Sequence, residues 1–134
     1  MALIYSILLV GNDKEFCNYF IGIAKLTGVL IESVHDADSA KQFLREKEFD
    51  AIIIDGCLPD IIGIDLVLWI KNELKNNKPI CFISAGYADA KSFKNIKQDL
   101  SIDFFLNKPL STSDIISLIE NLFEETGNRK NKQV

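Results

Sequence analysis

The sequence predicts a single α/β domain with a doubly wound parallel sheet, and three observations support this. Short apolar runs, such as residues 6–10, 51–54 and 80–84, are typical of strands buried on both faces. Segments with helical spacing of apolar residues separate such runs, giving five strands that alternate with five helices. The length of 134 residues suits one domain with a substantial core.

The first strand is expected at residues 6–10, where it ends in Gly11-Asn12-Asp13. Asp13 is a candidate N-cap for the first helix, and Gly28 provides its C-terminal stop. The apolar residues that recur on this helix are Phe16, Phe20 and Ile23.

The second strand is expected at residues 29–34, a short β-branched run. The segment Asp36-Ala37-Asp38-Ser39 offers several N-caps for the second helix. The inward positions of that helix are Ala40, Phe43 and Leu44.

The third strand is expected at residues 49–55, and the third helix opens within residues 60–63. This helix is expected to end before Pro79, because proline disfavours helical backbone at the residue before it. Its inward positions are Leu66, Ile70 and Leu74.

The last part of the domain is predicted as a strand at 80–84, a weaker helix at about 88–100 and a strand at 102–106. Ser111 to Asp114 resembles a capping box that starts a strongly periodic final helix. The predicted domain covers residues 1–126, and residues 127–134 form a polar C-terminal tail or linker stub that we expect to be disordered.

The net charge, the apolar stretches and the cysteine spacing argue against several classes of function. The net charge of −4 gives no support for a direct nucleic-acid or membrane partner, and no apolar stretch is long enough to span a bilayer. The N-terminus lacks the basic region of a signal peptide. The three cysteines form no Cys-x-x-Cys pair, and with the single His35 they do not have zinc-site spacing. A reducing, cytoplasmic location is therefore expected.

Polar residues follow several of the predicted strands. In a parallel sheet, Asp55, Ser84 and Lys108 would meet at the carboxyl edge, where such folds place their chemistry. A phosphoryl-transfer site needs a nucleophile, hydrogen-bond donors and positive charge. The nucleophile would be Asp55. The hydrogen-bond donors would be Ser84 and the backbone around Ala85, and the positive charge would come from Lys108.

These residues occur in motifs that resemble a response-regulator receiver domain of the chemotaxis (CheY-like) type, over residues 3–125. The matching pieces are Ile7-Leu8-Leu9-Val10, Asp55-x-x-Leu58-Pro59-x-x-x-Gly63, Ser84-Ala85 and Lys108-Pro109. The resemblance implies a flavodoxin-like sheet of order 2-1-3-4-5. It also implies two-component signal transduction without turnover of a substrate, beyond self-phosphorylation and self-dephosphorylation.

The resemblance assigns roles to individual residues. Asp55 would accept a phosphoryl group from a sensor histidine kinase or phosphotransfer protein. Lys108, followed by a cis peptide to Pro109, would pair with that group, while Ser84 and Ala85 would bind its oxygens. Phe105 stands at the switch position, although core packing explains it equally well. The output would pass to an effector protein or to a missing C-terminal domain.

The metal-binding part of the family pattern is altered. Receivers of this type hold magnesium with two adjacent acids after the first strand, but Gly11 and Asn12 stand there. Asp55, the backbone carbonyl of Cys57 and, weakly, Asn12 remain as expected ligands. Asp13 comes one place too late, and either reaches the ion through a water or only caps a helix. Magnesium is therefore expected to bind weakly or not at all.

Two other functions stay open for Asp55. The Gly11-Asn12 pair favours an atypical receiver that acts as a phosphorylation-independent interaction module. A haloacid-dehalogenase-type phosphatase also uses a strand-end Asp, but its Asp-x-Asp pair is replaced by Asp55-Gly56-Cys57. A flavin or dinucleotide carrier is disfavoured, since Gly11-Asn12-Asp13-Lys14 is not a phosphate-binding loop.

Overall fold

A computed structural model describes residues 4–56, 58–59, 63–74, 77–84 and 101–132. Within these residues a five-stranded parallel sheet has the order β2-β1-β3-β4-β5. This order and direction confirm the predicted topology. The strands are β1 (Ser6–Val10), β2 (Leu30–Val34), β3 (Ala51–Asp55), β4 (Ile80–Ser84) and β5 (Phe104–Asn107).

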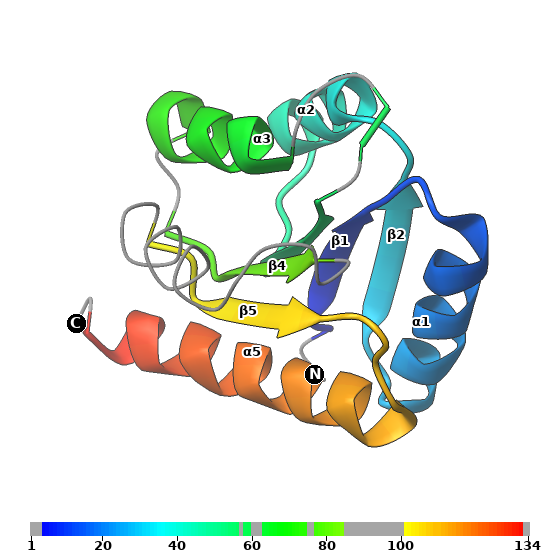
Figure 1. Ribbon diagram of the computed structural model, residues 1–134. Helices are drawn as coiled ribbons and strands as arrows, with labels where there is room; N and C mark the ends of the chain where they lie inside the picture. The colour runs from blue at the N-terminus through cyan, green and yellow to red at the C-terminus, as the bar shows by residue number, and fades with distance from the viewer. Residues whose placement is uncertain (1–3, 57, 60–62, 75–76, 85–100, 133–134) are drawn as a thin grey trace.

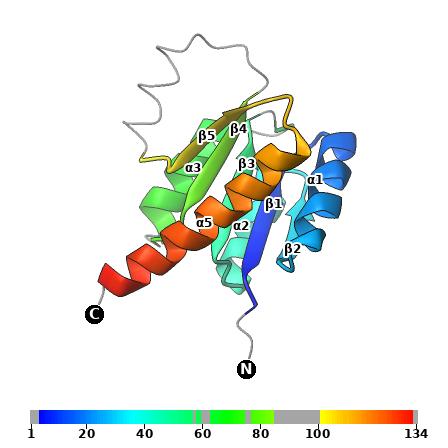
Figure 2. The same ribbon diagram turned by 90° about the horizontal axis from the view of Figure 1, so that it is seen from below.

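The helices cover both faces of the sheet. Helices α1 and α5 lie on one face, and α2 and α3 lie on the other (Figure 1, Figure 2). The helix predicted at about 88–100 lies outside the described residues. No described helix has the length and apolar character needed to cross a membrane. The described helices are α1 (Lys14–Leu26), α2 (Ala37–Glu46), α3 (Gly63–Trp69), which continues as the π-helix η1 (Ile70–Leu74), and α5 (Thr112–Lys132).

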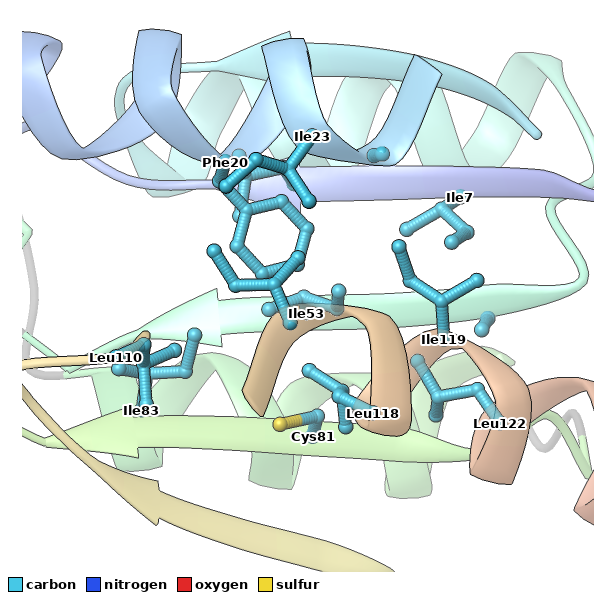
Figure 3. Close-up of a cluster of buried hydrophobic side chains, with 14 of the residues drawn as sticks. Ile7, Phe20, Ile23, Ile53, Cys81, Ile83, Leu110, Leu118, Ile119 and Leu122 are labelled. Carbon is cyan, nitrogen blue, oxygen red and sulfur yellow. The ribbon is translucent and has the colours of Figure 1, made fainter. Parts of the chain in front are cut away.

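The core consists of two apolar layers, one on each face of the sheet. On the α1 and α5 side, Phe20 of α1 and Ile119 of α5 meet Ile53 of β3 (Figure 3). On the other side, Leu66 and Ile70 pack against the sheet. Strands β1 and β3 are buried almost throughout, which explains their uninterrupted apolar sequence.

Short polar side chains begin three of the helices, as predicted. The Asp13 carboxylate accepts from the Phe16 amide (3.1 Å), and Asp36 does the same for Ser39 (2.7 Å). The capping box before α5 is reciprocal: the Ser111 amide donates to the Asp114 carboxylate, and the Asp114 amide donates to the Ser111 hydroxyl.

Strands β3 and β5 begin two residues later than predicted, because an Asp precedes each of them. The Asp50 carboxylate accepts from the Ser6 amide at 2.8 Å, and the Asp103 carboxylate accepts from the Ile80 amide at 2.8 Å. These side chains replace backbone carbonyls at the amino ends of the ladders. Residues 49 and 102 are buried but lie outside the strands.

The prediction of a disordered tail after residue 126 is wrong for residues 127–132, because α5 continues to Lys132. Arg129 anchors the extension by donating to Glu125, to the Asn77 carbonyl and to Asp103. One turn earlier, Thr126 is buried. These tertiary contacts outweigh the low helix propensity of Gly127 and its polar neighbours.

Candidate functional site

The carboxyl ends of β3, β4 and β5 bring three of the predicted site residues to one edge of the sheet (Figure 1). Asp55 is the last residue of β3 and pairs in register with Ile83. Ser84 ends β4 and pairs with Asn107. Lys108 follows β5, and its backbone N–H donates to the Ser84 carbonyl at 2.8 Å. The sheet register therefore fixes the backbone of Lys108 beside Ser84.

Asp55 is a buried carboxylate that forms an ion pair with Lys108. Only 2% of the Asp55 side chain is exposed, and its Oδ2 atom lies 2.7 Å from Lys108 Nζ. The Lys108–Pro109 peptide is cis, as the resemblance implied. Burying a carboxylate costs free energy unless it is paired, and Lys108 provides a partner here.

Asp13 and Phe16, at the start of α1, also contact Lys108. Asp13 Oδ1 accepts the amide of Phe16, while Oδ2 lies 3.4 Å from Lys108 Nζ. The ammonium group also lies 4.2 Å from the centroid of the Phe16 ring, in a cation–π contact. Asp13 is therefore a helix cap and a second partner of Lys108 at once.

Asp55, Lys108, Asp13 and Phe16 together form what we call the Asp55 corner. The contacts within it shift the pKa values of Lys108 and Asp13. Partial burial would lower the pKa of Lys108, but hydrogen bonding and charge attraction from Asp55, with help from Asp13, raise it above its ordinary value. The Phe16 amide and then Lys108 lower the pKa of Asp13. Burial, followed by the Asp55 charge, raises the pKa of the Cys17 thiol. Cys17 is therefore a protonated core residue rather than a nucleophile.

The residues after β1 do not fit the acidic magnesium pair of the family. A Cβ at Gly11 would lie 3.1 Å from Cys17 Sγ and 3.2 Å from Asp55 Cβ, so this position is tightly packed. Asn12 is exposed and offers only a neutral amide. No group of three His, Cys, Asp or Glu side chains suited to a metal is formed by the described part of the chain. Cys57 lies outside that part.

His35 fixes the backbone of the β1–α1 loop. The Gly11 carbonyl accepts from His35 Nδ1 at 3.0 Å, and the Gly11 amide donates to the Val34 carbonyl at 2.9 Å. The loop that carries Asp13 is thereby held against the end of β2.

Phe105 contacts the site through a second aromatic ring. It is half-buried on β5, and its ring lies 5.3 Å from that of Phe82, measured between centroids. A Cβ at Gly56 would lie 2.8 Å from Phe82 Cζ, and one at Gly63 would lie 3.1 Å from Phe82 Cε2. Phe82 therefore touches both Phe105 and the glycines that flank the loop after Asp55. Ala85 lies outside the described residues.

Sequence reasoning placed Asp55, Ser84 and Lys108 at this edge but missed the contacts of three other residues. The sequence allows Asp13 to be a helix cap or a water-linked metal ligand, but it does not indicate the pairing with Lys108. The sequence pattern places Phe16 among the recurring apolar residues of the first helix and Phe82 within the predicted strand at 80–84. The available signal was positional, since helix α1 begins at the same edge of the sheet.

A separate pocket of about 240 Å³ lies at the opposite, amino end of the sheet. It shares no residue with Asp13, Phe16, Asp55 or Lys108. Its lining residues are Ile4, Tyr5, Asp50, Phe123, Thr126, Gly127 and Lys130.

Comparison with known proteins gives consistent matches. Residues 7–120 match the response regulator receiver domain family. Over 118 residues the chain is 30% identical to the transcriptional regulatory protein GltR of Pseudomonas aeruginosa, covering 87% of this chain and 48% of GltR. The chain thus spans about half the length of that relative.

Solved structures of low sequence identity share the fold. A signal receiver domain from Vibrio parahaemolyticus has a TM-score of 0.89 at 21% identity, with 98% of this chain and 99% of that chain covered. A CheY-like receiver domain protein from Methanospirillum hungatei has a TM-score of 0.85 at 19% identity, with 95% and 99% covered.

Proposed function

The chain belongs to the response regulator receiver domain family of two-component systems, and we propose that Asp55 is its phosphoacceptor. The donor would be a phosphohistidine on a sensor histidine kinase or phosphotransfer protein. The observation that carries this proposal is the buried Asp55 carboxylate, 2.7 Å from the Lys108 ammonium at the carboxyl edge of the sheet. An acid on an exposed surface turn would need no such partner, because water would solvate its charge.

In the proposed step an Asp55 carboxylate oxygen attacks the phosphorus atom. The phosphorus–nitrogen bond to the donor imidazole breaks, its electron pair stays on the nitrogen, and the leaving imidazole takes up a proton. Asp55 becomes an acyl phosphate. Lys108, whose ammonium lies 2.7 Å from Asp55 Oδ2, would balance the negative charge that moves onto the phosphoryl oxygens.

Ser84 and Phe105 would link this chemistry to a partner surface. The Ser84 hydroxyl and the Ala85 backbone would bind phosphoryl oxygens. We propose that Phe105 changes its packing as Ser84 moves. Its contact with Phe82 gives a physical route, because Phe82 also touches the loop after Asp55. Such a response shifts a pre-existing equilibrium between two packings.

The output is proposed to be a protein contact. Because the chain covers only part of GltR, an effector protein or an attached effector domain would respond to the state of Asp55. We propose no turnover of a separate substrate. The family assignment gives no support to the phosphatase alternative.

A second candidate function is a receiver-like module that binds its partner without phosphate. The replacement of the acidic pair by Gly11 and Asn12 favours it. The fold and the partner surface would be the same, but Asp55 would remain unmodified.

Incubation with acetyl phosphate and Mg²⁺, followed by intact-mass measurement, tests the first candidate. One phosphoryl adduct is expected on the wild type and none on Asp55→Asn, which keeps the shape of the side chain but removes the nucleophile. A wild type that gains no adduct with acetyl phosphate or with any histidine kinase donor supports the second candidate.

A further inference from the structure

Among the described residues, the Lys108 ammonium has three partners at the Asp55 corner. Asp55 Oδ2 lies 2.7 Å away, Asp13 Oδ2 lies 3.4 Å away, and the Phe16 ring centroid lies 4.2 Å away. The lysine side chain is only 20% exposed. The contacts with Asp13 and Phe16 go beyond what an ion pair with Asp55 alone would require.

The charge of Lys108 cancels one of the two negative charges in this group. The carboxylates of Asp13 and Asp55 and the ammonium of Lys108 together leave one formal negative charge. Gly11 adds no side chain, and Asn12 adds no charge. A divalent cation is held chiefly by charged oxygens, but here both carboxylates already share a cation.

We propose that Lys108 is the resident counter-ion of the Asp55 corner in place of a divalent metal, and that Asp13 and Phe16 are the positioning residues that hold it there. The caps of most helices serve only the backbone, whereas Asp13 divides its oxygens between the α1 cap and Lys108. This deepens the proposed function by naming the cation of the site. It does not require that Asp55 is ever phosphorylated.

The proposal makes metal and lysine competitors. A divalent ion that binds Asp55 must displace the ammonium from Oδ2 and overcome its repulsion. Removing Lys108 should therefore strengthen metal binding. Adding a carboxylate at Asn12 should do the same, because a hard anionic ligand would then stand beside the site.

Mn²⁺ binding, measured by electron paramagnetic resonance of the free ion without any phosphodonor, tests this competition. We expect the wild type to bind with a dissociation constant of about a millimolar or weaker. Lys108→Met and Asn12→Asp should each bind about tenfold more tightly or better. Tight wild-type binding that Lys108→Met leaves unchanged or weakens would overturn the proposal.

Proton NMR of Lys108 tests the two positioning residues and does not depend on how Lys108→Met folds. In the wild type, the Phe16 ring should shift the Lys108 ε-methylene signals upfield, and Phe16→Leu should abolish that shift. Asp13→Asn keeps an N-cap of similar strength but removes the charge. It should therefore speed exchange of the ammonium protons severalfold. Lysine signals that neither variant changes would contradict the assigned roles.

The two proposals fail in different ways. If Mn²⁺ binding and the NMR shifts behave as expected but no phosphoryl adduct forms, the phosphoacceptor role fails and the lysine counter-ion stands. If an adduct forms and the wild type also binds Mn²⁺ tightly in the presence of Lys108, the phosphoacceptor role stands and the counter-ion proposal falls.

Discussion

At the level of single residues, the Asp55 corner is governed by charge balance in a buried place. Asp55 is 2% exposed, and Lys108 supplies its neutralising contact. Removing one partner from such a pair costs more than removing both, because it leaves a buried charge without its counter-ion. This asymmetry gives a stability test that is independent of any signalling partner.

Lys108→Met should lower the free energy of unfolding by about 1–3 kcal/mol at neutral pH, less than for a fully buried pair since Lys108 is partly exposed. Asp55→Asn combined with Lys108→Met should lose less than Lys108→Met alone. Urea unfolding of the wild type, the two single variants and the double variant measures these effects. A double variant that loses the sum of the single effects would show that the two side chains do not interact.

Tyr5 is a residue whose protonation should control stability at high pH. Its hydroxyl is hydrogen-bonded to Thr126 at 2.7 Å, and burial raises the pKa of Tyr5 from 10.0 to about 12. Because the pKa is higher in the folded state, the folded protein holds the proton more tightly. The associated stability is complete below about pH 10 and is lost as the pH rises toward 12.

We expect the free energy of unfolding to fall by up to about 3 kcal/mol across that pH range, at 1.36 kcal/mol for each pKa unit. Tyr5→Phe should lower stability at neutral pH by about 1 kcal/mol, because it removes the hydrogen bond. It should also flatten the alkaline decline. Urea unfolding at a series of alkaline pH values checks this, and equal declines in both proteins would count against it.

At the level of secondary structure, the end of α5 depends on one arginine. Arg129 joins Glu125 of the same helix to Asp103 and to the carbonyl of Asn77. Its side chain is 16% exposed, so these contacts are partly shielded from water. The neighbouring Lys130 is exposed and provides a matched control.

Arg129→Met should destabilise the protein by about 1–2 kcal/mol and increase amide hydrogen exchange over residues 127–132. Lys130→Met should change the free energy of unfolding by no more than about 0.5 kcal/mol. It should leave amide exchange over residues 127–132 correspondingly unchanged. Hydrogen exchange with mass spectrometry follows the helix end directly. Protection that survives Arg129→Met would mean that other contacts hold α5.

The loop after β3 depends on close approach of backbone to an aromatic ring. A Cβ at Gly56 would lie 2.8 Å from Phe82, whereas a Cβ at Gly22, on the exposed side of α1, would have no neighbour within 4 Å. Gly56→Ala should therefore cost about 1–3 kcal/mol. Gly22→Ala should add about 0.5–1 kcal/mol of stability. Thermal or urea unfolding compares them, and similar effects of the two changes would refute the crowding argument.

At the level of the whole molecule, the sheet could be predicted from the sequence because its strands are buried on both faces. Runs such as residues 51–55 and 80–84 have one interpretation once helical segments separate them. The strand-end position of Asp55 and Lys108 then followed from parallel topology. The order of the strands required the family resemblance, since apolar runs do not say which strand is central.

Other features were not predictable because they depend on contacts between distant parts of the chain. The Asp13–Lys108 contact joins residues 95 positions apart and depends on side-chain placement. The extension of α5 past Gly127 depends on Arg129 meeting Asp103, against the local composition. In both cases a polar residue has a local partner and also a distant one. Asp13 caps α1 and also contacts Lys108, while Arg129 pairs with Glu125 and also contacts Asp103.

We expect Asp55, rather than another carboxylate of the corner, to be the phosphoacceptor. Borohydride reduces an acyl phosphate of aspartate to homoserine, so peptide mass spectrometry after phosphodonor treatment locates the modified residue. We predict homoserine at position 55 and an unchanged Asp13, which shares Lys108 but is exposed. Conversion at Asp13, or no conversion at any carboxylate with any donor, would contradict the account.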